Sequence, residues 1–261
     1  MKQKINFKLL LASGIFFALA SCNSQQGTKD QSESTDTTAQ TTSDSASAPT
    51  SAQSNAMDAV KIAPDLYKPL TDSLGIRVME INYKSGDSSA MHSHPDLVLY
   101  VINGGKSRFT MQDGSSQTRD LKSGSTMIVP ATTHTVKNIG NTTEKAILVE
   151  VNRANTAPKI QDAATDAVKV APKLYKVLAD TMNIRAVMAT YKPGDSSALH
   201  AHPDNAIYVI DGGTAEFTLK DGTKQTLTLG SGMAQVRPGE MHSVKNTGKT
   251  TLKVLIVETT R

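Results

Sequence analysis

The chain of 261 residues contains a single cysteine, Cys22, so it cannot form an internal disulfide bond. It also has no clear surplus of charge. Without Lys2, Lys4 and Lys8 of the N-terminal segment, the 28 basic residues fall to 25, against 24 acidic residues. Nucleic-acid-binding proteins usually carry a basic patch, so no nucleic acid is expected as a partner. No long segment repeats apolar residues with a helical period of 3.6, which argues against a mainly helical fold.

The first 21 residues have the pattern of a bacterial lipoprotein signal peptide. Three lysines precede an apolar run over 9–20, which is too short for a permanent membrane helix. The run ends in Leu19-Ala20-Ser21-Cys22, which resembles a lipobox with cleavage before Cys22 and acylation of its thiol and new amine. We therefore expect Cys22 to anchor the protein in a membrane of the cell envelope, on the periplasmic side or at the cell surface. Two alternatives stay open: a secretory signal with a chance cysteine, and a cytosolic protein with an apolar start.

Residues 22–56 are predicted to form a disordered tether that begins at the lipidated cysteine. After Cys22 this tract consists mostly of Ser, Thr, Gln, Asp and Ala and contains no aromatic residue. Such a composition buries too little apolar surface to offset the entropy lost on ordering. A second polar segment, 153–164, is the expected link between two domains.

The rest of the chain is an internal duplication. Residues 58–151 align without a gap onto residues 166–259, an offset of 108 residues (166 − 58), and about half of the positions are identical. Each copy is long enough for a hydrophobic core of its own. The predicted domains are 57–152 and 165–261.

Each repeat contains short runs of residues typical of β-strands. In the first repeat these runs are 76–83, 98–102, 109–111, 127–129 and 146–151, separated by Gly, Asp, Asn, Ser and Pro. Asp113-Gly114 and Asp221-Gly222 are hairpin signals, since such a pair tolerates the positive φ angles of a type I′ turn. The segment that begins at Asp58 is expected to open with a turn or a short helix. The pattern predicts an all-β fold of antiparallel strands, a sandwich or a barrel in each repeat.

All six histidines belong to two matching triplets. They are His92, His94 and His134, and their partners 108 residues later, His200, His202 and His242. In a strand, positions i and i+2 point to the same face, and the third ring comes from a different strand. Three imidazoles that converge in this way can hold a first-row transition ion and leave coordination positions open.

The histidine segments resemble the two motifs of the cupin superfamily. The segment Gly86-Asp-Ser-Ser-Ala-Met-His92-Ser-His94 matches the first motif, and the segment from Gly124 through Pro130 to His134 and Asn138 matches the second. Both motifs recur in the second repeat. The resemblance covers nearly all of both repeats and implies two tandem jelly-roll β-barrels after the tether. Each barrel would hold a divalent Mn, Fe, Ni, Zn or Cu ion on its three histidines.

The sequence departs from the cupin pattern at the usual fourth ligand. Cupins commonly add a Glu three or four residues after the second histidine, where this chain has Leu97 or Val98, and Asn205 or Ala206 in the copy. The nearest carboxylates, Asp96 and Asp204, and the polar Asn205 are the candidate additional ligands. Asp96 and Asp204 can equally be turn-forming residues after a proline. An ion on three neutral imidazoles keeps its full charge and favours an anionic fourth ligand.

The two repeats differ where a ligand would be recognised. If the cupin register holds, the second repeat places Arg237, Glu240 and Gln235 near the pocket rim. Tyr100 and Tyr208 are further candidates for the rim, although packing inside the barrel is the alternative. The second repeat is therefore the better candidate for chemistry.

Three functions remain open from the sequence. The first is an envelope-anchored bicupin that binds a metal in each barrel and a small organic ligand. The second is a metal-dependent enzyme, such as a dioxygenase or an isomerase, although the motifs place no acid–base pair. The third is a metal-free structural or interaction module that pairs as a homodimer through strand edges.

Overall fold

The computed structural model describes residues 57–152, 162 and 164–259. The predicted signal peptide, the lipidation site Cys22, the tether 22–56 and most of the link 153–164 lie outside these residues. Within the described ranges, no helix has both the length and the apolar character needed to cross a membrane.

The first repeat consists of a one-turn helix and a series of antiparallel strands. These elements are α2 (Ala59–Ile62), β1 (Tyr67–Ser73), β2 (Ile76–Tyr83), β3 (His92–His94), β4 (Asp96–Asn103), β5 (Gly105–Met111), β6 (Ser116–Leu121), β7 (Thr126–Val129), β8 (Thr132–Asn138) and β9 (Glu144–Val151).

The second repeat contains the same elements in the same order. They are α3 (Ala167–Val170), β10 (Tyr175–Thr181), β11 (Ile184–Tyr191), β12 (His200–His202), β13 (Asn205–Asp211), β14 (Gly213–Leu219), β15 (Lys224–Leu229), β16 (Ala234–Arg237), β17 (Glu240–Asn246) and β18 (Leu252–Thr259).

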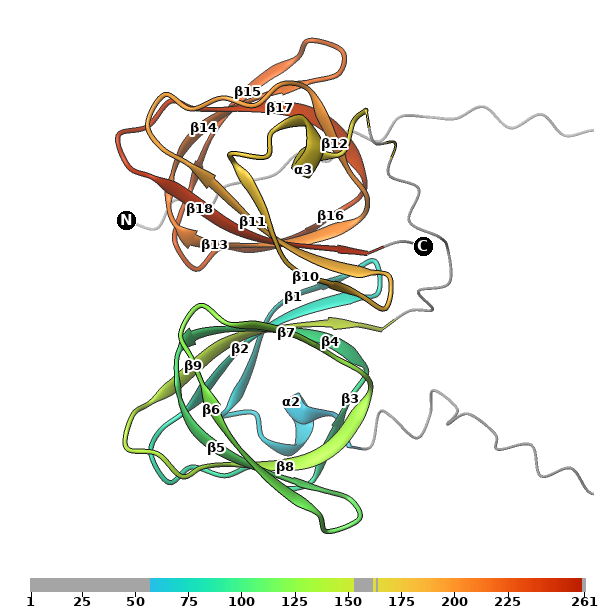
Figure 1. Ribbon diagram of the computed structural model, residues 1–261, viewed down its shortest axis with the longest axis vertical. Helices are drawn as coiled ribbons and strands as arrows, with labels where there is room; N and C mark the ends of the chain where they lie inside the picture. The colour runs from blue at the N-terminus through green and yellow to red at the C-terminus, as the bar shows by residue number, and fades with distance from the viewer. Residues whose placement is uncertain (1–56, 153–161, 163, 260–261) are drawn as a thin grey trace, which may run out of the picture. The chain divides into compact units, whose positions relative to one another are not determined.

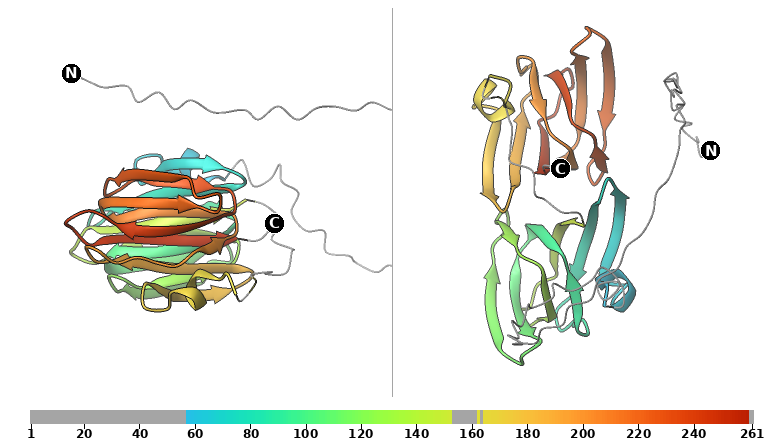
Figure 2. Two further views of the ribbon diagram at one scale, coloured as in Figure 1. Left: turned by 90° about the horizontal axis from the view of Figure 1, so that it is seen from above. Right: turned by 90° about the vertical axis from the view of Figure 1, so that its right-hand side faces the viewer.

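Two sheets face each other in each repeat and form a jelly-roll barrel (Figure 1). In the first repeat, the five-stranded sheet has the order β1-β2-β9-β4-β7 and the four-stranded sheet has the order β3-β8-β5-β6. The second repeat has the corresponding sheets β10-β11-β18-β13-β16 and β12-β17-β14-β15. Within each repeat the strands lie roughly along one axis (Figure 2), and paired neighbours run in opposite directions. The all-β prediction of two tandem jelly-roll barrels is confirmed.

Strand alternation divides the apolar residues of each five-stranded sheet between two cores. In β9, Ile147 and Val149 belong to a buried cluster that draws residues from both repeats, whereas Leu148 belongs to a cluster inside the first barrel. Successive side chains of a strand point to opposite faces, so Glu150, two positions after Leu148, faces the barrel interior. This placement brings a carboxylate toward the histidines.

The hairpin turns differ in part from the prediction. At Asp113-Gly114 the hairpin is present, but only Gly114 has a positive φ, of 83°, so the turn is not of type I′. The Gly114 amide donates to the Met111 carbonyl, which places the turn one residue earlier than expected. Positive φ at both central residues, the requirement of type I′, occurs instead at Leu74-Gly75 between β1 and β2.

Candidate metal centre

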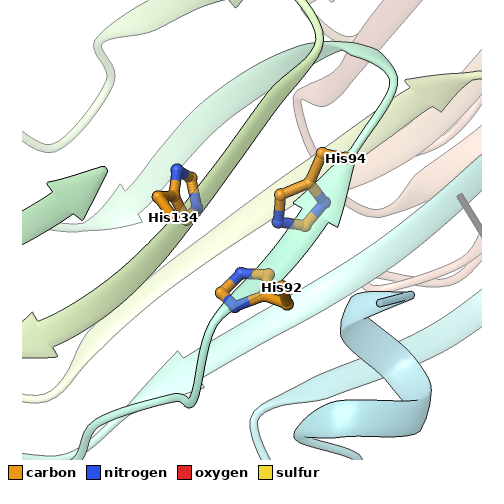
Figure 3. Close-up of side chains that lie close together, drawn as sticks. All are labelled: His92, His94 and His134. Carbon is orange, nitrogen blue, oxygen red and sulfur yellow. The ribbon is translucent and has the colours of Figure 1, made fainter. Parts of the chain in front are cut away.

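The first histidine triplet converges inside the first barrel. Strand β3 presents His92 and His94 on one face, and β8 presents His134 directly opposite His92 (Figure 3). The ring centroids lie 4.8 to 5.4 Å apart, and one ring nitrogen from each residue lies within 4.8 Å of the others. His92 and His94 are almost fully buried. The predicted convergence of three imidazoles from two strands is what the structure shows.

The second triplet has the same geometry. Strand β12 presents His200 and His202, and β17 presents His242 opposite His200. These ring centroids also lie 4.8 to 5.4 Å apart, and all three residues are buried. The duplication therefore preserves the arrangement of side chains as well as the sequence.

A buried carboxylate orients one histidine of each triplet. The Nδ1 of His94 lies 2.6 Å from Glu150, which is fully buried, and the Nδ1 of His202 lies 2.7 Å from Glu258. Each glutamate also accepts a hydrogen bond from an arginine, Arg77 or Arg185. When Nδ1–H donates to the carboxylate, the lone pair on Nε2 is available for a metal. Carboxylates commonly fix the tautomer and orientation of metal-binding histidines in this way.

Sequence reasoning missed Glu150 and Glu258. A signal was present, because an acid stands at the same position of both copies inside a strongly apolar strand. Alternation along that strand points this acid to the interior, where an unpaired charge would be costly.

A pair of tyrosines contacts another histidine. The Nδ1 of His92 lies 2.8 Å from the Ala90 carbonyl, so this nitrogen is the donor and Nε2 is the acceptor. The Tyr67 hydroxyl lies 2.9 Å from that Nε2 and accepts in turn from the Tyr83 hydroxyl. Burial raises the pKa of Tyr67 well above its ordinary value, which keeps the phenol neutral and able to donate. An ion on His92 would displace this hydrogen bond.

His92, His134 and His200 are uncharged at neutral pH. Burial lowers the pKa of His92 to about 4 and that of His134 to about 3, and it lowers the pKa of His200 to about 4. A neutral imidazole is the form that binds metal. Three imidazoles, one of them oriented by a carboxylate, are a donor set that fits a divalent transition ion.

The candidate additional ligands have other partners. An oxygen of Asp96 accepts from the Ala131 amide at 2.8 Å, and the equivalent oxygen of Asp204 accepts from the Gly239 amide at 2.8 Å. Each aspartate thus closes the turn before the strand that carries the third histidine, in agreement with the turn-forming alternative. Asn205 lines the second cavity, but its side-chain nitrogen donates to the Pro203 carbonyl.

The predicted rim residues separate into two groups. Arg237 and Glu240 line the second cavity and form an ion pair of 2.8 Å, and Glu240 also lies 3.0 Å from the Nδ1 of His242. Tyr100 and Tyr208 lie instead in the buried cluster shared by the two repeats, because alternation turns them to the outer face of their sheets. Gln235 is half-buried on β16 and is not among the residues that line the second cavity. The rim assignments of Tyr100 and Tyr208 are corrected accordingly, whereas that of Gln235, two residues before Arg237 on the same strand, stays a prediction.

Each triplet opens onto a cavity inside its barrel. The first cavity has a volume of about 160 Å³ and is lined mainly by apolar side chains together with His94 and His134. The second has a volume of about 50 Å³ and is lined by His202 and His242. A ligand in either cavity would therefore meet the histidines.

Comparisons with known proteins agree with this geometry. The family described as Cupin domain matches residues 187–258, within the second repeat. A structure of oxalate decarboxylase from Bacillus subtilis, in a study of its Mn(II) centres, is similar with a TM-score of 0.52 at 19% identity, over 76% of this chain and 71% of that one. The second repeat matches the cupin domain family, and the two barrels together have the fold of a tandem cupin.

A second solved structure of different sequence is also similar in fold. AerE from Microcystis aeruginosa matches with a TM-score of 0.51 at 13% identity, over 75% of this chain and 98% of that one. No curated protein sequence matches the chain. At such low identity the likeness shows the fold, and the function of this tandem cupin must be argued from its own site.

Proposed function

We propose that this tandem cupin is anchored in the cell envelope and binds one divalent transition metal in each barrel, together with a small organic ligand. The observation that carries the proposal is the pair of matching triplets, in which a buried glutamate holds the Nδ1 of one histidine and leaves its Nε2 for the ion. The Mn(II) centres of the similar oxalate decarboxylase support manganese as one candidate. Iron, nickel, zinc and copper suit the same donors.

The metal content of the purified protein tests the proposal. We expect the full-length chain, prepared without a histidine tag, to hold two ions per chain by elemental analysis. His94→Ala and His202→Ala should each hold one ion, and the double variant should hold none. An absence of metal under every loading condition would contradict the proposal, as would equal metal content in the wild type and the double variant.

The anchor is tested separately. The lipobox-like segment before Cys22 supports lipidation. We expect the wild type in the membrane fraction of the producing cell and Cys22→Ala in the soluble fraction. The same distribution for both proteins would contradict anchoring through this cysteine and would leave the metal sites untouched.

A further inference from the structure

The two cavities have diverged although the metal-binding triplets have not. Leu97 and Val129 line the first cavity, and the residues at the same positions of the second repeat are Asn205 and Arg237, which line the smaller cavity. A volume of about 160 Å³ is comparable with that of an apolar cavity known to bind benzene, roughly 150 Å³. The first barrel can therefore take a ring-sized apolar group, whereas about 50 Å³ in the second cannot.

In each barrel one arginine guanidinium lies over a phenylalanine at the equivalent position of the repeat, but the two arginines come from different strands. Arg119 of β6 lies 5.7 Å from the ring centroid of Phe109, and Arg237 of β16 lies 5.8 Å from that of Phe217. The two phenylalanines are equivalent in the repeat, and each ring lies 5.6 Å from the third histidine of its triplet. The arginines are not equivalent, since the second repeat has Leu227 where the first has Arg119.

The charge of the two arginines is balanced differently. Arg237 forms an ion pair of 2.8 Å with Glu240, so this guanidinium already has a carboxylate partner. The first repeat has Thr132 at the position of Glu240. Arg119 donates to the neutral Gln117 side chain and forms no ion pair with the described part of the chain. The mouth of the first cavity thus presents a cation that suits an anionic group.

A buried acceptor lines the first cavity farther along the barrel. Glu144 accepts from Ser107 with one oxygen, and its other oxygen is buried without a hydrogen-bond partner among the described residues. Ser107 lies four residues along β5 from Met111, which pairs with His134, a separation of about 13 Å at the rise of a strand. The second repeat has Ala215 and Leu252 at the positions of Ser107 and Glu144. A buried acceptor without a partner needs a donor from elsewhere.

We propose that the first barrel binds an aromatic carboxylate that carries a hydrogen-bond donor at its far end. Its carboxylate lies between Arg119 and the histidine triplet, its ring fills the apolar middle of the cavity, and its donor meets the free oxygen of Glu144. This inference rests on the proposed function for the role of the barrel as a ligand site. It also accounts for the absent motif glutamate, because a ligand carboxylate can supply the anionic fourth donor that a metal on three neutral imidazoles favours.

Calorimetric titration of the full-length protein with 4-hydroxybenzoate tests the inference, on metal-free and manganese-loaded samples. We expect one equivalent to bind. Arg119→Leu, which installs the residue of the second repeat, should weaken binding at least tenfold. The control Arg108→Leu, at an exposed position of the neighbouring strand β5, should leave it unchanged. Ser107→Ala with Glu144→Leu, the pair found in the second barrel, should remove the preference for 4-hydroxybenzoate over benzoate.

Four results would overturn the inference. The first is a lack of binding of both 4-hydroxybenzoate and benzoate, and the second is binding that falls as much in Arg108→Leu as in Arg119→Leu. The third is equal affinity of the wild type for 4-hydroxybenzoate and benzoate. The fourth is equal affinity of the wild type for benzoate and the uncharged benzyl alcohol. Leu99→Phe, which narrows the cavity and spares Arg119, should also weaken binding. Elemental analysis of the same samples separates the two proposals. Ligand binding to protein that takes up no metal after manganese loading would contradict the metal sites and not the ligand site.

Discussion

At the scale of single residues, a buried glutamate binds the Nδ1 of the second histidine of each triplet and thereby orients that imidazole for metal binding. Glu150 is fully buried and is held by His94 on one oxygen and by Arg77 on the other. The glutamate of the cupin motif is absent. Glu150 places a carboxylate beside the site without being a ligand itself. Its effect on the metal is exerted through the orientation and basicity of the imidazole.

Glu150→Gln should weaken metal binding at the first site by about 10- to 100-fold, because a glutamine amide no longer favours the Nδ1–H tautomer of His94. Competition with a chelator of known affinity, monitored for each site, measures the effect. Glu258→Gln should do the same at the second site, and the surface variant Glu80→Gln should do neither. Unchanged affinity in Glu150→Gln would show that His94 is oriented by packing alone.

The pKa values of the histidines predict that the metal-free protein loses stability in mild acid. Unfolded histidines take up protons near pH 6.5, whereas folded His92 and His200 do so only near pH 4 and folded His134 near pH 3. Between these values the unfolded state binds more protons, so the free energy of unfolding falls as the pH falls from 6.5 toward 4. Urea unfolding at pH 7.5 and pH 5.0, with chelator present, should show this loss, and His134→Leu should reduce it. Equal stability at both pH values would contradict the burial of neutral imidazoles.

At the scale of elements, a buried charged network ties the helix of each repeat to its five-stranded sheet. In the second repeat, Asp166 caps α3 by accepting from the Val168 amide and also binds both terminal nitrogens of Arg185 on β11, at 2.9 and 3.0 Å. Arg185 reaches Glu258 on β18 with its remaining nitrogen. Helix, strand and histidine support are therefore parts of one network.

Arg185→Ala should destabilise the protein by about 3–5 kcal/mol, because it leaves Asp166 and Glu258 buried without their cation. The midpoint of urea unfolding, with an unchanged slope, measures the loss. Lys224→Ala breaks the Lys224–Glu216 pair on β15 and β14, whose lysine side chain is 62% exposed, and should cost about 1 kcal/mol or less. A loss of similar size in both variants would argue against the network.

Several strands could be predicted from the sequence and others could not. The run 76–83 coincides with β2, because its apolar residues are dense and a turn bounds it. Strand β6 (Ser116–Leu121) escaped prediction, since its residues are almost all exposed and polar. Strand β1 also escaped, because Pro69 stands within it, and proline is tolerated there at the edge of the sheet.

At the scale of the whole molecule, the outer faces of the two five-stranded sheets contribute to one buried cluster. Val78 and Val98 of the first repeat share this cluster with Ala186 and Val257 of the second, and all four are buried almost completely. A common core of this kind couples the stability of the two repeats.

The metal-free protein is therefore expected to unfold in one cooperative transition. Ala186→Asp buries a charge in the shared cluster and should separate the transition into two, because the coupling between repeats is lost. Far-UV circular dichroism during urea unfolding measures the number of transitions. Thr226→Asp, on an exposed position of β15, should keep a single transition. Two transitions in the wild type would show that the repeats unfold independently.

The sequence by itself determined the duplication, the all-β fold and the two histidine triplets, because strand periodicity and repeated motifs are local and visible along the chain. Only the tertiary structure decided which residues surround those histidines. Glu150 lies 56 residues from His94, and Arg119 and Phe109 come from two strands. It likewise decided that the first cavity is the larger one, since the space left inside a closed barrel depends on every side chain that points into it at once.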